Sequence, residues 1–86
     1  MYVVELKFDD NPVRLERRPA HRELLVELAE RGLVRGAGPW EDGTGAMVIF
    51  DVATEEELDA LIAEDPYYQS PGLSVVSKRR WANLIN

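Results

Sequence analysis

His21 is the only histidine in the chain, and imidazole is the side chain best suited to proton transfer near neutral pH. It shares a helical spacing of i, i+3, i+4 and i+7 with Leu24, Leu25 and Leu28, so we expect its ring to lie near a sheet and not in solvent. At this stage a structural role is the alternative, in which a partly buried imidazole is satisfied by a backbone carbonyl.

Asp65 stands before Pro66 at the predicted end of a second helix. A carboxylate there faces the negative end of the helix dipole, which disfavours it by about 0.3–1 kcal/mol, so a compensating partner is expected. Where the helices run antiparallel to their strands, the first helix begins and the second ends at the same edge, and His21 can meet Asp65. A histidine oriented by a carboxylate is the minimum equipment of a general base. A solvated acid at a turn is the alternative.

Three arginines, Arg14, Arg17 and Arg18, stand shortly before His21 in a segment with no strand periodicity. We predict that this segment is a loop and that Arg14 and Arg18 bind substrate. Guanidinium groups pair with planar anions through two parallel hydrogen bonds, so they could clamp an acidic or phenolic oxygen. The alternative is a solvated run of charge.

Gly38, Pro39 and Tyr67 are the other residues predicted to line a substrate cleft. Glycine permits close approach to the backbone, and tyrosine offers a hydrogen-bond donor on an apolar body. Ordinary turn chemistry and packing are the alternatives for these residues.

The pattern of apolar residues and turn signals defines the elements that must position these side chains. Pro19 is placed in a first helical turn, Gly32 at a helix end, and Thr54 with Glu57 in a capping box. The predicted elements are a strand at Tyr2–Phe8, a loop over residues 9–18, a helix at Pro19–Arg31, a strand at Leu33–Trp40, a hairpin at Glu41–Gly45, a strand at Ala46–Val52, a helix from Thr54 to Asp65, and a strand at Leu73–Arg80.

This order, β-α-β-β-α-β, predicts an α+β fold of the ferredoxin-like kind, with a four-stranded antiparallel sheet and two helices on one face. All 86 residues are expected to form one domain. The other sheet face has no helices, yet Val3, Met47, Ile49 and Val76 are predicted to point there. An apolar patch of this kind usually marks an interface, so we predict a homodimer through the open face of the sheet.

The composition narrows the classes of function. The chain has no cysteine and one histidine, which makes a structural metal site implausible. Its net charge of −6 opposes phosphate contacts, so we expect no nucleic-acid partner. No apolar run approaches the roughly 20 residues that span a bilayer, and no basic leader precedes one, which predicts a cytoplasmic protein without a membrane partner. No phosphate loop or dinucleotide motif occurs, and no cofactor is expected.

The combination of Arg18-Pro-Ala-His21, Gly36-Ala-Gly38-Pro39, a Gly-Thr-Gly hairpin and Asp65-Pro66-Tyr67 resembles the YCII-related (YciI-like) family over nearly the whole chain. The resemblance implies a ferredoxin-like domain that dimerises as an α/β-barrel-like assembly. It also implies an active site holding His21 and Asp65 as its His–Asp pair, lined by Gly38, Pro39 and Tyr67. The family includes a dehydrochlorinase acting on a chlorinated hydroxyquinol, but the family name supplies no substrate.

One departure concerns the last strand, which usually ends in a Pro-aromatic pair in this family. Here Lys78-Arg79-Arg80-Trp81 occupies that stretch, so the rim of the cleft is expected to differ.

The expected function is that of a cofactor-independent small-molecule enzyme, of a lyase, isomerase or dehydrochlorinase-like type. His21 would move a proton on a cyclic or phenolic metabolite, while Asp65 fixes its tautomer. Two alternatives stay open. One is a non-catalytic, ligand-binding or stress-associated homodimer, and the other is a module whose open sheet face pairs with a different protein.

Overall fold

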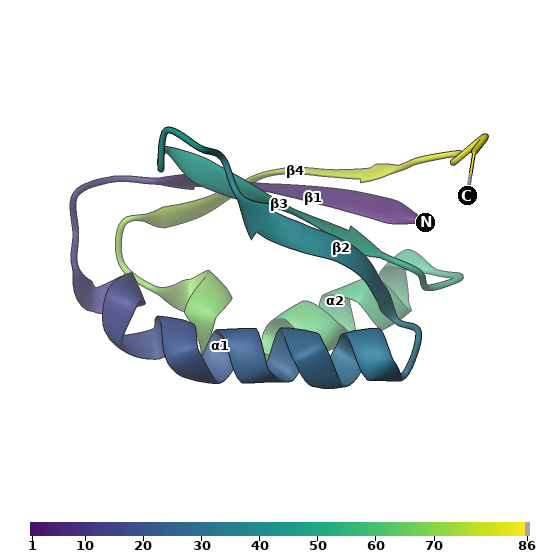
Figure 1. Ribbon diagram of the computed structural model, residues 1–86, viewed down its shortest axis with the longest axis horizontal. Coiled ribbons are helices and arrows are strands. Elements are labelled where there is room, and N and C mark those ends of the chain that lie inside the picture. Colours follow the sequence, from purple (N-terminus) through teal and green to yellow (C-terminus); the bar gives the residue numbers. More distant parts are fainter. Residues whose placement is uncertain (86) are drawn as a thin grey trace.

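The computed structural model describes residues 1–85 and has the predicted α+β architecture. Four strands form one antiparallel sheet in the order β2-β3-β1-β4, and both helices lie against the same face (Figure 1). The ferredoxin-like fold is therefore confirmed. Its elements are β1 (Tyr2–Phe8), α1 (Val13–Glu30), β2 (Val34–Pro39), β3 (Gly45–Phe50), α2 (Glu55–Glu64), the 3-10 helix η1 (Pro66–Gln69) and β4 (Leu73–Arg80).

The central strand β1 shows why the alternating sequence pattern is informative. Tyr2, Val4 and Leu6 are buried on the side of the helices, while the residues between them are more exposed. Val48 and Phe50 of β3 pair with Val4 and Tyr2 and extend the same buried layer. Cross-strand neighbours on one face pack together, so these residues form the floor of the core.

The start of α1 is the main error of the sequence interpretation. The predicted loop over residues 9–18 is wrong from Val13 onward, because α1 begins there and continues through Pro19. The Asn11 side chain accepts a hydrogen bond from the Val13 N–H at 3.0 Å, which satisfies one of the free donors of the first turn. Proline is far commoner in the first helical turn than in the interior, and this preference misplaced the boundary.

The longer helix changes the setting of two predicted features. Arg14, Arg17 and Arg18 are helical residues and not loop residues. His21 lies about two turns into α1 instead of in its first turn.

The end of α1 follows the predicted glycine stop. Gly32 has a φ of 77°, its N–H donates to Ala29 O, and the Leu33 N–H donates to Leu28 O at 2.9 Å. These two bonds form a Schellman motif, which satisfies the last carbonyl groups of the helix.

The predicted cap of α2 is also present. Thr54 Oγ1 accepts a hydrogen bond from the Glu57 N–H, and the Glu57 carboxylate accepts one from the Ala53 N–H, both at 3.2 Å. Beyond α2, the short segment before the last strand forms η1, with both Tyr67 and Tyr68 buried.

Gly45, the first residue of β3 after the β2–β3 hairpin, is a position that requires glycine. At Gly45, a Cβ atom would overlap the carbonyl oxygen of Leu6 on the neighbouring strand, so a side chain cannot be accommodated without moving the backbone. The predicted strand bounds, Leu33–Trp40 and Ala46–Val52, each differ from β2 and β3 by one or two residues.

The sheet face opposite the helices carries the expected apolar residues. Val3, Met47 and Ile49 are half-buried there and line a hollow together with Trp81 and the charged residues Glu5, Arg79 and Arg80. Val76 is 56% exposed, and it lies at a bulge where the register of β1 and β4 shifts. Within residues 1–85, no helix is both long and apolar enough to cross a bilayer.

Tyr68 provides a test of the packing around η1. Its hydroxyl group is buried and has no hydrogen-bond partner among residues 1–85. Burial raises the pKa of this hydroxyl, and the negative charges of Asp65 and of ionised Tyr67 add to the rise. The folded-state pKa therefore lies above the unfolded value of about 10, so the contribution of Tyr68 to stability is complete below that pH and is lost above it.

We expect Tyr68→Phe to be as stable as the wild type at neutral pH or more stable by up to about 1–3 kcal/mol, because an unpartnered buried hydroxyl is removed. The variant should also lose less stability between about pH 9 and pH 11, because its ring has no proton to release. Urea unfolding across this range measures both effects. Marked destabilisation at neutral pH, or an identical alkaline loss in both proteins, would contradict this account of the Tyr68 site.

Candidate active site

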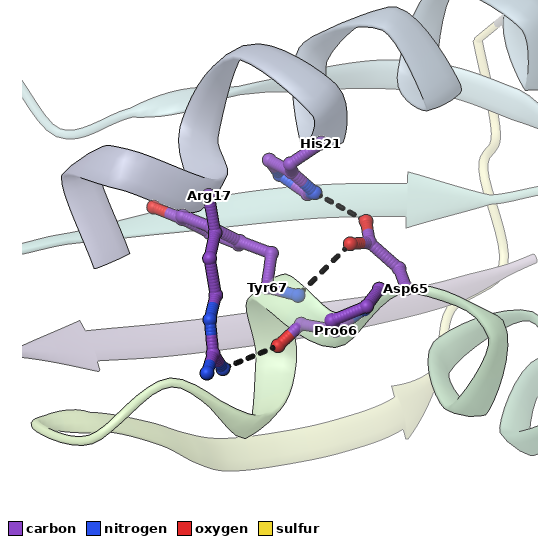
Figure 2. A network of polar contacts seen from close by, with 5 residues as sticks. All are labelled: Arg17, His21, Asp65, Pro66 and Tyr67. Atoms are coloured by element: carbon purple, nitrogen blue, oxygen red, sulfur yellow. Dashed lines mark hydrogen bonds and ion pairs between the residues drawn. The ribbon is translucent and has the colours of Figure 1, made fainter. Parts of the chain in front are cut away.

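His21 and Asp65 meet in the core between α1 and the end of α2. Their relative exposures are 6% and 4%, and His21 Nδ1 lies 2.5 Å from Asp65 Oδ2 (Figure 2). An ionised carboxylate only accepts hydrogen bonds, so the proton of this contact belongs to His21 Nδ1. The structure thus brings together two residues that are 44 positions apart in sequence, as the topology predicted.

Asp65 is held from two sides. It is the C-terminal cap of α2 and also the N-terminal cap of η1, where its Oδ1 accepts a hydrogen bond from the Tyr67 N–H at 3.0 Å. The two carboxylate oxygens therefore have one donor each, from His21 and from Tyr67. These bonds supply the compensation that an acid at the negative end of a helix requires.

Two tyrosines fix the plane of the His21 ring. Tyr67 stacks on it with a centroid distance of 4.0 Å and an interplanar angle of 13°, and Tyr68 meets it edge-on at 5.3 Å. Among residues 1–85, no side-chain hydrogen bond involves His21 Nε2. Because Nδ1 is engaged by Asp65, Nε2 is the ring nitrogen left for a ligand.

A cavity of about 550 Å³ opens between α1 and the edge strand β2, within the usual size range of small-molecule sites. Six of the residues predicted from sequence line it, namely Arg14, Arg18, His21, Gly38, Pro39 and Tyr67. Asp65 does not line the cavity but lies behind His21. The cavity is thus the place where a ligand can reach the imidazole.

Arg14 connects the cavity wall to Tyr67. Its guanidinium lies 3.9 Å from the centre of the Phe8 ring and donates a hydrogen bond to the Tyr67 hydroxyl at 3.5 Å. A hydroxyl that accepts from Arg14 keeps its own proton free to donate to a ligand oxygen. Arg17 has a different position, since it donates to the carbonyl oxygen of Pro66 at 3.2 Å and does not line the cavity (Figure 2).

Gly38 lines the cavity through its backbone. It pairs with Met47 of β3, so a Cβ atom at Gly38 would point to the open sheet face and away from α1. That Cβ atom would have no neighbour within 4 Å among the described residues, so the space that a side chain would fill at Gly38 lies on the open face.

The sequence interpretation missed several cavity residues, above all Arg22 of α1 and Arg35 of β2. Arg22 could have been found by extending the four-residue spacing from Arg14 and Arg18 once that segment is read as helix. Arg35 has no such signal, because only the packing of α1 against β2 brings it to the cavity.

The residues present favour acid–base chemistry with oxyanion binding. An imidazole oriented by a carboxylate faces a space that also contains a tyrosine hydroxyl and guanidinium groups, which are donors for a developing negative charge. Within residues 1–85, no group of three or more His, Cys, Asp or Glu side chains is arranged to hold a metal ion.

Comparison with known proteins agrees with the fold. One solved structure that resembles the chain is 5-chloro-2-hydroxyhydroquinone dehydrochlorinase (TftG) from Burkholderia phenoliruptrix AC1100, in complex with 2,5-dihydroxybenzoquinone. The two chains are 19% identical, with a TM-score of 0.74 over 95% of this chain and 94% of the other. The search of curated proteins finds no match.

The family assignment comes from a second comparison. The family model of the YCII-related domain matches residues 1–82, which is nearly the whole chain and includes every residue of the site described above. The chain therefore belongs to the YCII-related family.

Proposed function

We propose that this protein is a cofactor-independent enzyme that moves a proton on a cyclic or phenolic metabolite, with His21 as the base and Asp65 as the residue that orients it. The observation that carries this proposal is the buried contact of 2.5 Å between His21 Nδ1 and Asp65 Oδ2, beside a cavity that His21 itself lines. A structural histidine satisfied by a backbone carbonyl would not have the carboxylate partner that His21 has here.

The proposed chemistry starts with transfer of a substrate proton to His21 Nε2. Asp65 stabilises the imidazolium that forms and keeps the Nδ1 proton in place. The electron pair left on the substrate is delocalised onto a ring oxygen, which accepts hydrogen bonds from the Tyr67 hydroxyl and a cavity guanidinium. If His21 returns the proton to a different atom of the substrate, the result is an isomerisation. If the electron pair on the substrate instead expels a leaving group, the result is an elimination.

The name of the similar solved structure supports an elimination among these outcomes. That protein is a dehydrochlorinase of a chlorinated, hydroxylated ring, a class of reaction in which a proton and chloride leave the substrate. At 19% identity the likeness shows the fold alone, so it serves here to choose the first compounds to test.

We also propose that two copies of the chain associate through the open sheet face. Val3, Met47 and Ile49 present apolar surface there, and Trp81 is 42% exposed beside them. A second copy would cover this surface, since self-association pairs the same patch of both subunits.

The catalytic proposal is tested with His21→Gln, because an amide keeps a donor near Asp65 but cannot act as a base at neutral pH. The wild type should release chloride from 5-chloro-2-hydroxyhydroquinone, or exchange ring protons of related phenols for deuterium in heavy water. His21→Gln should be slower by about 10²–10⁴-fold, the range that general bases contribute. Chloride assay and proton NMR measure these rates.

Circular dichroism and urea unfolding of His21→Gln provide the control for folding. Full activity in a folded His21→Gln protein would refute the catalytic role. Binding of such compounds by the wild type, without any turnover or exchange, would instead favour the non-catalytic ligand-binding role.

The dimer proposal is tested with Ile49→Lys, which places a charge in the middle of the open face. Sedimentation should give a wild-type mass of twice 9.8 kDa, and Ile49→Lys should sediment as a monomer because burying an unpaired charge is costly. Leu15→Lys is the matched control, since Leu15 is 42% exposed on α1, and it should remain dimeric. A monomeric wild type, or a variant that is still dimeric, would refute this interface.

A further inference from the structure

The cavity wall has a cationic character that the acid–base pair does not explain. Arg14, Arg18 and Arg22 are spaced four residues apart on α1, and Arg35 is the second residue of β2. These four arginines all line the cavity, whereas no Asp or Glu does. The chain as a whole has 16 acidic residues and a net charge of −6, so this concentration of positive charge runs against the overall balance.

We propose that the substrate is a ring compound that carries an oxyanion, either a carboxylate or a phosphoryl group, and that Arg18 and Arg22 bind this group. The inference deepens the proposed function by naming the class of substrate. It rests on that proposal for the identity of the site, and its test measures binding instead of turnover.

The arginines of α1 are in an unfavourable position for a purely structural role. Arg14 lies in the first turn of the helix, where the helix dipole disfavours cations, and only Glu16 is acidic in that turn. Like charges four residues apart also repel each other. An anion bound between Arg18 and Arg22 would relieve this repulsion, because it would pair with both guanidinium groups.

Pairing within residues 1–85 does not neutralise this group. Arg35 is paired with Asp51 at 2.9 Å, but Arg14, Arg18 and Arg22 have no carboxylate within 4.0 Å among the described residues. The Nε atom of Arg14 is buried and has no hydrogen-bond partner in that part of the chain. A buried guanidinium nitrogen normally has an acceptor, so Arg14 Nε points to a ligand oxygen in this part of the cavity. Arg18 is half-buried and Arg22 is exposed, and their guanidinium groups line the same cavity without a carboxylate partner, which leaves them available to an oxyanion.

The rest of the wall indicates that the ligand also has an apolar body. Beyond Arg22 along α1, the cavity is lined by Leu25, Val26 and Ala29, and Val34 at the start of β2 also lines it. Val26 is 59% exposed, so this wall has apolar surface that a ligand could cover. A ring against these residues and an oxyanion at Arg18 and Arg22 would place the ring near His21.

The experiment is an NMR titration of ¹⁵N-labelled protein with four probes: 4-hydroxybenzoate, its neutral counterpart 4-hydroxybenzamide, phenyl phosphate and inorganic phosphate. At least one of the two ring oxyanions should bind at least about tenfold more tightly than 4-hydroxybenzamide, which corresponds to one charge-assisted hydrogen bond. The shifts should map to α1 and β2. The tighter of 4-hydroxybenzoate and phenyl phosphate identifies the oxyanion as a carboxylate or a phosphoryl group.

The variant Arg18→Gln/Arg22→Gln should remove this preference for the charged probes. Arg31→Gln is the matched control, because it removes a charge from the exposed end of the same helix outside the cavity, and it should bind the probes as the wild type does.

Three results would overturn the inference. The first is that neither ring oxyanion binds better than 4-hydroxybenzamide, and the second is unchanged binding in Arg18→Gln/Arg22→Gln. The third is inorganic phosphate binding as tightly as the tighter of the two ring oxyanions, because the apolar body would then contribute nothing. All three concern binding, so inactivity of the His21–Asp65 pair would leave them unaffected and would be recognised separately.

Discussion

A buried carboxylate at the negative end of a helix is unfavourable unless donors reach both of its oxygens, and the arrangement around Asp65 follows from that requirement. One donor is the Tyr67 N–H, which begins η1, and the other is His21 Nδ1 of α1. The same carboxylate therefore ends α2, starts η1 and ties both to the first helix. Removing it would leave a buried imidazole and a helix start without acceptors, so the position of the site and the local fold depend on the same group.

The fold gives this carboxylate its partner and the cavity its walls. Two β-α-β units place the beginning of α1 and the end of α2 at the same end of the sheet, where β1 ends and β4 begins. This is why residues far apart in sequence meet there. Packing of α1 beside β2 then opens a cavity in front of His21, with arginines on one side and apolar residues further along the helix. The base, the hydroxyl donor and the cationic wall thus come from separate elements and converge on one space, as substrate positioning requires.

The sequence predicted those parts that local physics determines. Alternation in β1, the glycine after α1 and the Thr54 cap each have a short-range cause, and the structure confirms them. The meeting of His21 and Asp65 followed from topology. The extension of α1 through Pro19 could not be predicted from local preference, because here the surrounding helix tolerates a proline that usually begins one. Arg35 joins the cavity only through tertiary packing, so nothing in its neighbouring residues indicated that position.

The most direct test of the central claim uses the single histidine, whose side chain gives one set of NMR signals. Two-bond ¹H–¹⁵N correlation reports which ring nitrogen is protonated, in the wild type and in Asp65→Asn. In the variant, the amide oxygen can keep the bond from the Tyr67 N–H while its NH₂ group faces His21. The account predicts a proton on Nδ1 of the neutral ring in the wild type and its transfer to Nε2 in Asp65→Asn, as expected when the orienting acceptor becomes a donor. The same tautomer in both proteins would show that Asp65 does not orient His21.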